Sequence, residues 1–180
     1  MWSLNTWNSL TVLKGHLCPV WDVKFGAFGH YFISGGADRT TRLWSIEQSK
    51  PIRIFCGQSS DVKAIEFHPN CNYIISGSED CSIVLYDFLT GASERHFVGH
   101  QYPISALKIS SDGQMLASGD AGGVINIWDI STAKCIGKLN LTANVFFLIY
   151  IYVRVINNQK PIITAADFWD ICFRILHIKI

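Results

Sequence analysis

The sequence predicts an all-β fold, a partial β-propeller of three four-stranded blades, and two observations carry the prediction. First, several sequence marks recur every 42 residues along the 180-residue chain. Second, each period divides into four short runs rich in apolar, β-branched and aromatic residues, and turn residues separate these runs. Gly-rich turns with a period of about 40–45 residues are typical of propeller blades built from consecutive hairpins.

Three kinds of mark define the repeat: a glycine followed by a polar residue, a serine followed by glycine, and an aromatic residue. They are Gly15-His16, Gly57-Gln58 and Gly99-His100, then Ser34, Ser76 and Ser118, then Trp44, Tyr86 and Trp128. The same spacing counted backwards from Trp44 reaches Trp2. We therefore predict the end of a preceding blade, three full blades and a tail. Their ranges are 1–14, 15–56 (blade 1), 57–98 (blade 2), 99–139 (blade 3) and 140–180.

Each predicted blade contains four strands. In blade 1 they are VWDVKF (20–25), YFISG (31–35), TTRLWSI (40–46) and PIRIF (51–55). Blade 2 repeats the order with DVKAIEF, YIISG, SIVLYDF and RHFV, and blade 3 with PISALKI, MLASG, VINIWDI and CIGKL. Because a propeller blade buries both faces against its neighbours, an open arc of three is expected to leave apolar surface exposed.

The tail opens with an apolar run, ANVFFLIYIYVRVI (143–156). Its uncharged apolar core spans only 9 residues, and a helix that crosses a bilayer needs about 20, so no membrane anchor is expected. The repeat marks do not continue here, since Leu141 and Thr142 stand where glycine and histidine would open a fourth blade. We interpret residues 140–180 as non-repeat sequence or a degenerate blade, able to add a strand to blade 3.

The composition limits the classes of function. Fifteen basic and 14 acidic side chains give a net charge of +1, so no broad basic surface for direct nucleic-acid binding is expected. The six cysteines show neither CxxC nor zinc-finger spacing, which favours free thiols in a reducing compartment and no metal site. No secretory signal is present in the first residues. No cofactor or small-molecule substrate is expected.

The order GH, SG, Asp, W-[DS] at constant offsets resembles the WD40 repeat family over residues 1 to about 139. The resemblance implies a buried network in each blade, in which histidine binds the turn aspartate and the serine, and serine meets the tryptophan nitrogen. The residues at these positions are His16, Ser34, Asp38 and Trp44 in blade 1, Gln58, Ser76, Asp80 and Tyr86 in blade 2, and His100, Ser118 and Trp128 in blade 3. Gly122 replaces the turn aspartate of blade 3, and Asp120 is the candidate substitute.

Ser34, His16 and Asp38 are also the residue types of a hydrolase triad. Nucleophilic catalysis needs an exposed hydroxyl, a base within reach and an oxyanion site, and no GxSxG elbow accompanies Ser34. We therefore favour the structural role and expect no enzyme activity, with hydrolysis as the alternative.

The resemblance further implies that partners bind along one rim, at the start of each first strand and just before the turn aspartate. The first-strand positions are Pro19, Trp21, Asp61, Lys63, Pro103 and Ser105, and the turn positions are Ala37, Glu79 and Ala121. Trp21 is the leading candidate, because exposed tryptophan is typical of interface anchors. The alternative is that its ring only packs over the central channel.

Four stretches outside the shared motif resemble one branch of the family, the WD40 TBP-associated factors of the transcription complexes TFIID and SAGA. They are GHLCPVWD (15–22), YFISGGADRTTRLWS (31–45), PIRIFCG (51–57) and FHPNCNYIISGSED (67–80). This resemblance implies a non-catalytic nuclear scaffold that binds TBP-associated histone-fold subunits. The alternatives are a WD40 adaptor in ubiquitin ligase or signalling complexes, and a truncated product without independent function.

Overall fold

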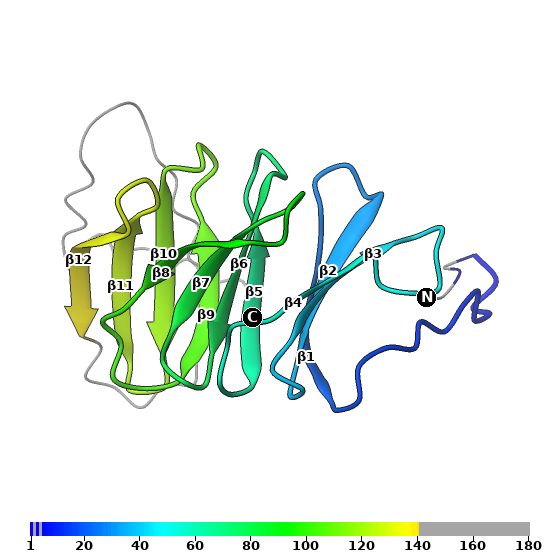
Figure 1. The fold of residues 1–180 in the computed structure, drawn as a ribbon, viewed down its shortest axis with the longest axis horizontal. Coiled ribbons are helices and arrows are strands. Elements are labelled where there is room, and N and C mark those ends of the chain that lie inside the picture. The colour runs from blue at the N-terminus through cyan, green and yellow to red at the C-terminus, as the bar shows by residue number, and fades with distance from the viewer. Residues whose placement is uncertain (2, 4, 141–180) are drawn as a thin grey trace, which may run out of the picture.

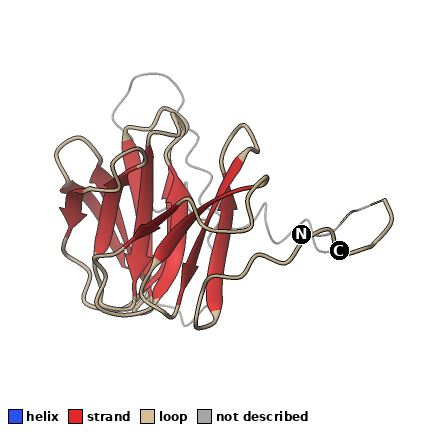
Figure 2. Ribbon diagram, turned by 45° about the vertical axis from the view of Figure 1, so that its right-hand side comes forward, coloured by secondary structure: helices blue, strands red, loops and turns tan. Residues whose placement is uncertain are grey.

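The computed structural model describes residues 1, 3 and 5–140, and these residues form an all-β fold without a helix (Figure 2). Twelve strands make three four-stranded antiparallel sheets, each built from strands consecutive in the chain. The sheets stand in a row in chain order, with β5 in contact with both β1 and β9 (Figure 1). The predicted fold class, a partial β-propeller of three blades, is confirmed.

The observed strands follow the predicted runs to within two residues at each end. Blade 1 consists of β1 (Val20–Phe25), β2 (Tyr31–Gly36), β3 (Thr41–Ser45) and β4 (Arg53–Phe55). Blade 2 consists of β5 (Val62–Phe67), β6 (Tyr73–Ser78), β7 (Ile83–Asp87) and β8 (Ser93–Phe97). Blade 3 consists of β9 (Ile104–Ile109), β10 (Met115–Asp120), β11 (Val124–Asp129) and β12 (Lys134–Asn140).

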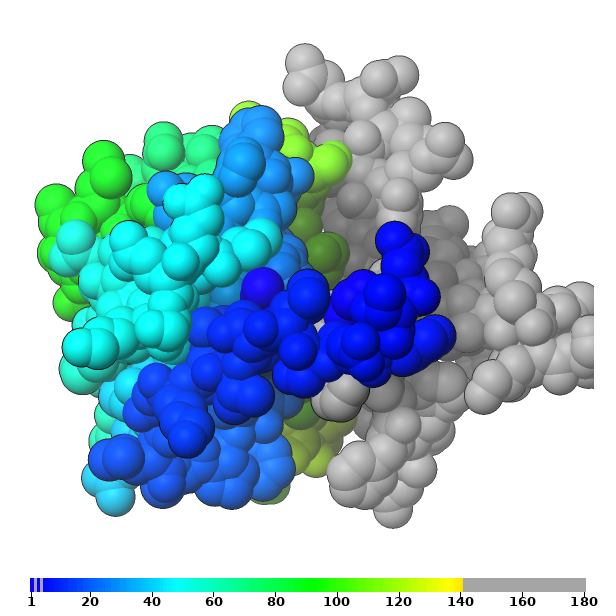
Figure 3. All heavy atoms as spheres, turned by 90° about the vertical axis from the view of Figure 1, so that its right-hand side faces the viewer, coloured from blue at the N-terminus to red at the C-terminus, as the bar shows by residue number. Residues whose placement is uncertain are grey.

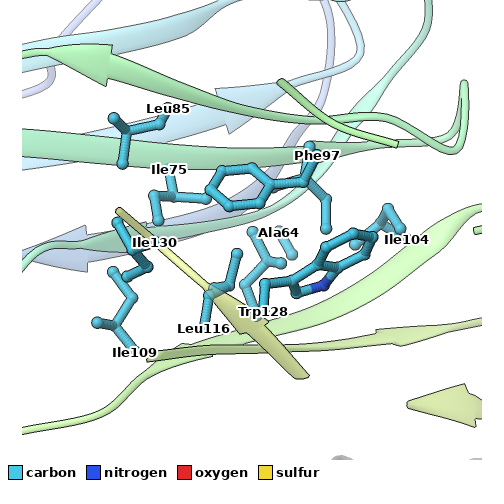
Figure 4. Close-up of a cluster of buried hydrophobic side chains, with 11 residues drawn as sticks. Ala64, Ile75, Leu85, Phe97, Ile104, Ile109, Leu116, Trp128 and Ile130 are labelled. Carbon is cyan, nitrogen blue, oxygen red and sulfur yellow. The ribbon is translucent and has the colours of Figure 1, made fainter. Parts of the chain in front are cut away.

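Two apolar clusters hold neighbouring blades together. Between blades 1 and 2, Ile33, Leu43 and Phe55 face a set from blade 2 that includes Val62 and Ile65. Between blades 2 and 3 the cluster is larger and centres on Phe97 and Trp128, whose rings meet edge to face at 5.8 Å between centroids (Figure 4). A third, smaller group on blade 3 comprises Ala117, Ile125 and Ile127. The core is therefore a stack of sheet-on-sheet contacts, as expected for propeller blades.

The first strand of blade 1 lacks such a neighbour among the described residues. Val62 and Ile65 of β5 are fully buried against blade 1, whereas their equivalents Val20 and Val23 in β1 are 43% and 46% exposed. Phe25 is also exposed at the same face. The expected apolar surface of an open arc is therefore present on this flank of blade 1.

Residues 1–14, predicted as the end of a preceding blade, contain no strand in their described part. Within the described residues of 1–14, the chain makes local backbone bonds such as Trp7 N to Ser3 O, and no strand is present. In Figure 3 this segment, in the darkest blue, lies beside blade 1 on the side that faces the viewer. A physical reason is that an outer strand forms only when it pairs with the third strand of its own blade, and the described chain supplies no such strand before β1.

The predicted tail lies outside the described residues, except for Asn140 at the end of β12. The apolar run 143–156 belongs to that part of the chain. In the part that is described, no helix combines the length and the apolarity needed to cross a bilayer.

Candidate functional site

The blade 1 residues of the predicted network form one continuous chain of hydrogen bonds. His16 Nδ1 lies 2.9 Å from Asp38 Oδ2, and His16 Nε2 lies 2.6 Å from Ser34 Oγ. Trp44 Nε1 donates to the same Ser34 oxygen at 2.8 Å. Because Ser34 Oγ accepts the Trp44 N–H, its own hydroxyl proton is free to face His16 Nε2. One serine thus links β2, β3 and the segment before β1.

Blade 3 contains the same chain with its aspartate in another position. His100 Nδ1 lies 2.8 Å from Asp120 Oδ2, His100 Nε2 lies 2.6 Å from Ser118 Oγ, and Trp128 Nε1 donates to Ser118 Oγ at 2.7 Å. Asp120 also accepts the backbone N–H groups of the turn that follows it. The candidate substitute for the missing turn aspartate therefore occupies the histidine's partner position.

Aspartate and glycine have exchanged places between these two blades. Gly36 and Asp38 of blade 1 correspond, 84 residues on, to Asp120 and Gly122 of blade 3. A Cβ at Gly36 would lie 2.8 Å from the histidine Nδ1, and a Cβ at Gly122 would collide with the ring of Tyr102. Each blade therefore has room for a side chain at only one of the two positions, and that position carries the aspartate.

Blade 2 keeps the links with an amide and a phenol. Gln58 Nε2 donates to Ser76 Oγ at 2.8 Å, and Gln58 Oε1 lies 2.9 Å from Ser82 Oγ. Ser82 donates its hydroxyl proton to Asp80 Oδ1, and the other Asp80 oxygen accepts the Ser59 N–H at 2.7 Å. Burial raises the pKa of the Tyr86 phenol, with a smaller opposing effect from a hydrogen bond to Ser76. In this blade the side chain of Ser82 therefore lies between the turn aspartate and Gln58, the residue predicted to be its partner.

The geometry of Ser34 does not suit a nucleophile. Its side chain is buried, and its oxygen already accepts the Trp44 N–H while its proton faces His16. A nucleophilic serine needs a free hydroxyl open to substrate. The buried chain of bonds instead satisfies polar groups that would otherwise be costly inside the sheet.

Three of the predicted rim residues share one special backbone position. Register shifts leave Trp21, Lys63 and Ser105 out of the strand ladder, each one residue after the start of the first strand in its blade. A bulge of this kind bends the strand and re-aims its side chain. The bulges therefore turn these three side chains away from the sheet ladder at the same end of each blade.

Trp21, Asp61 and Lys63 meet across the seam between blades 1 and 2. Trp21 Nε1 donates to Asp61 Oδ2 at 2.9 Å, Lys63 Nζ donates to the same oxygen at 3.2 Å, and this ammonium lies 3.8 Å from the Trp21 ring centroid. The Lys63 hydrogen bond, assisted by that of Trp21, holds the pKa of Asp61 below its usual value. The indole is 49% exposed yet fixed at both its N–H and its face.

The remaining rim residues pair in the same way in every blade. The N–H before each turn aspartate position donates to the carbonyl at the start of the first strand: Ala37 to Pro19 at 2.8 Å, Glu79 to Asp61 at 2.9 Å and Ala121 to Pro103 at 2.8 Å. The first-strand and turn positions therefore lie side by side along one edge. Ser105 differs from its equivalents, because its hydroxyl bonds the Gly119 carbonyl at 3.1 Å.

Sequence reasoning missed several residues that the site uses. Thr40 donates its hydroxyl to Asp38 at 2.7 Å, and the buried Arg42 donates to the same carboxylate at 3.0 Å. Burial raises the pKa of Asp38, but hydrogen bonds from Thr40 and His16 outweigh it and hold the pKa below its usual value. The D-x-T and D-x-S spacing is a signature of aspartate turns and was available for this inference. Half-exposed Tyr102, also missed, adds an aromatic ring to the rim of blade 3.

The described residues contain no group of three histidine, cysteine, aspartate or glutamate side chains suited to a metal ion. Five cysteines fall within this part of the chain, and all five are free thiols.

Comparison with protein families finds the WD domain, G-beta repeat at residues 7–45, 49–87 and 91–129, which is more than half of the chain. The second match includes β4 together with β5–β7, and the third includes β8 together with β9–β11. The second and third repeats therefore each supply the outer strand of one blade and three strands of the next, and the first match covers β1–β3 of blade 1. No curated protein sequence matches the chain.

Proposed function

The chain belongs to the WD40 repeat family, and from that premise we propose that it is a non-catalytic scaffold that binds a protein partner through its rim. The cluster of Trp21, Asp61 and Lys63 carries the proposal. An aromatic side chain held in place before binding loses little conformational entropy when a partner covers it. The hydrogen bond to Asp61 and the ammonium of Lys63 hold the indole of Trp21 in this way.

We further propose that the partner belongs to a nuclear transcription complex of the TFIID or SAGA type, and that TBP-associated histone-fold subunits occupy the rim. The support is the likeness of four stretches outside the repeat motif, in residues 15–22, 31–45, 51–57 and 67–80. Three of these stretches reach the rim, since they contain Trp21, Ala37 and Glu79.

A binding titration with a purified pair of TBP-associated histone-fold subunits tests both levels. Trp21→Ala is expected to raise the Kd at least about tenfold, because central aromatic anchors carry much of the binding free energy. Leu89→Ala is the control, since Leu89 is exposed in the turn between β7 and β8, away from the rim. An unchanged Kd for Trp21→Ala would exclude the rim. Binding to ubiquitin ligase or G-protein components instead would support the adaptor alternative.

A further inference from the structure

A small apolar pocket opens between blades 1 and 2 on the face opposite the rim. Its volume is about 120 Å³, and its lining includes the rings of Phe28, Tyr31, Phe67 and Phe88 together with His30. The turn after β1 forms one wall, whereas the rim lies at the other end of the same strand. Tyr31 and Phe88 meet edge to face across the seam, with 5.6 Å between their ring centroids. These contacts form the pocket walls without any partner present.

The seam between blades 2 and 3 contains a side chain at the equivalent place. His68 occupies it: its Nε2 lies 2.9 Å from the Gly113 carbonyl oxygen, and its ring meets Tyr73 at 5.8 Å between centroids. A Cβ on Gly113 would lie 2.5 Å from the imidazole, so the histidine fits only because residue 113 has no side chain. Here the chain itself fills the seam.

Between blades 1 and 2 both residues of this arrangement differ. Counted 42 residues back, His68 corresponds to Gly26 and Gly113 corresponds to Cys71. Gly26 leaves the space of the imidazole open, and both residues line the pocket. The aliphatic residues Ile109 and Ile130 of blade 3 correspond to the aromatic Phe67 and Phe88. The pocket thus occupies the place that an inserted side chain fills in the neighbouring seam, and its walls are more aromatic.

We propose that this pocket receives one apolar side chain, such as leucine or phenylalanine, from a partner polypeptide. An enclosed apolar cavity of about 150 Å³ holds benzene, and this pocket of about 120 Å³ is open on one side, so it has room for one side chain that enters from outside. The occupant of the equivalent seam is itself a side chain projecting from a backbone. Phe28, 79% exposed beside the opening, offers an aromatic surface for the rest of the partner segment. This second docking point is independent of the rim and of the partner proposed for it.

The test uses blocked amino-acid amides as probes and backbone amide NMR spectra of the full chain. N-acetyl-leucine amide and N-acetyl-phenylalanine amide are expected to shift the signals of Gly26, Tyr31, Phe67 and Phe88 at millimolar concentration. N-acetyl-aspartate amide is expected to shift them far less, because His30 is the only lining side chain that can carry a positive charge to pair with a carboxylate.

Gly26→His combined with Cys71→Gly reproduces, between blades 1 and 2, the His68 and Gly113 arrangement of the neighbouring seam. The new imidazole should fill the pocket, so probe binding is expected to weaken at least tenfold. Phe28→Ser is the second variant, and it is also expected to weaken probe binding. Its exposed ring contributes little to the fold, so this variant is expected to fold as the unmodified chain does. Val98→Asp is the matched control, because Val98 is also 79% exposed and does not line the pocket. It is expected to bind the probes as the unmodified chain does.

Three results would overturn the proposal. Absence of shifts at the pocket with either apolar amide would show that it receives no side chain. Shifts with benzene but not with the amides would identify a site for small apolar molecules only. Self-association that disappears in the plugged double variant would identify a second copy of the chain as the occupant.

Discussion

At the scale of single residues, one serine hydroxyl in each of blades 1 and 3 serves two buried partners at once. Ser118 accepts the Trp128 N–H and meets His100 Nε2, and all three side chains are buried. No water can replace a lost partner cheaply at such a site. The serine is therefore the most sensitive member of the chain of hydrogen bonds.

Ser118→Ala is expected to lower the free energy of unfolding by about 1–3 kcal/mol, because the Trp128 N–H and His100 Nε2 would both remain buried without a partner. Urea denaturation followed by tryptophan fluorescence measures this loss. Ser105→Ala, at the exposed bulge of β9, serves as the control and is expected to change stability by less than about 0.5 kcal/mol. Equal effects of the two substitutions would contradict the role assigned to Ser118.

The turn aspartate of blade 2, Asp80, is expected to make the free energy of unfolding depend on pH. Burial raises the pKa of Asp80, but hydrogen bonds from Ser82 and Ser59 outweigh it and hold the pKa below the usual value of 3.8. The stabilisation is therefore present above the unfolded pKa and is lost as pH falls through the lower folded pKa. Asp80→Asn is expected to make the free energy of unfolding less dependent on pH below about pH 4. An unchanged acid limb in melts between pH 5 and pH 2 would refute this.

At this scale the sequence predicts which residues meet but not how. The positions of His16, Ser34 and Trp44 recur at the same offsets within each 42-residue repeat, and this recurrence indicates that they meet within the blade, as they do. The sequence offered Asp120 as a candidate partner for His100 in place of Gly122. It could not establish the contact, since either position lies within reach of the histidine. The contribution of Arg42 could not be predicted, because its equivalents in the other blades are Val84 and Asn126.

At the scale of elements, the second strands of blades 1 and 2 each carry a glycine against which the next blade packs. A Cβ on Gly35 would lie 2.8 Å from Val62, and a Cβ on Gly77 would lie 2.5 Å from Ile104. These positions are the S-G marks of the repeat, so the sequence signature records the closeness of neighbouring sheets. Short apolar and β-branched runs between turn residues predicted the strands well, whereas the bulges at Trp21 and Lys63 depend on how adjacent strands twist and gave no signal.

Gly77→Ala is expected to destabilise the chain by about 1–3 kcal/mol, because its methyl group would overlap Ile104 in the seam between blades 2 and 3. Gly119→Ala provides a matched comparison at the equivalent place in blade 3. Among the described residues its added Cβ first meets Ala106, at 4.0 Å, an ordinary contact. Thermal melts should therefore separate the two variants, and a smaller loss for Gly77→Ala than for Gly119→Ala would count against the packing described here.

At the scale of the whole molecule, equivalent positions in β1 and β5 have opposite environments. Ile65 is fully buried between blades, while Val23 is half-exposed on the flank of blade 1. The periodicity predicted this open flank, because three blades in a row leave a terminal face. The pocket between blades 1 and 2 was not predictable, since it follows from the pairing of Gly26 with Cys71 across a seam.

Ile65→Glu is expected to lower the free energy of unfolding by more than about 3 kcal/mol, because it buries an unpaired charge. Val23→Glu, its equivalent in blade 1, is expected to leave stability nearly unchanged and to reduce self-association through the exposed flank. Urea melts and sedimentation at several concentrations measure both effects. Comparable destabilisation by the two substitutions would show that the flank of blade 1 is covered in solution.

We propose that this chain binds protein through the rim around Trp21, and hydrogen exchange tests this binding most directly. The chain is mixed with a saturating pair of TBP-associated histone-fold subunits, and protection of its backbone amides is compared with that of the free chain. Protection is predicted in residues 17–21, 59–63 and 101–105, with the turns at 26–30 and 46–50 unchanged. Protection confined to those opposite turns, or none in any blade, would contradict the account.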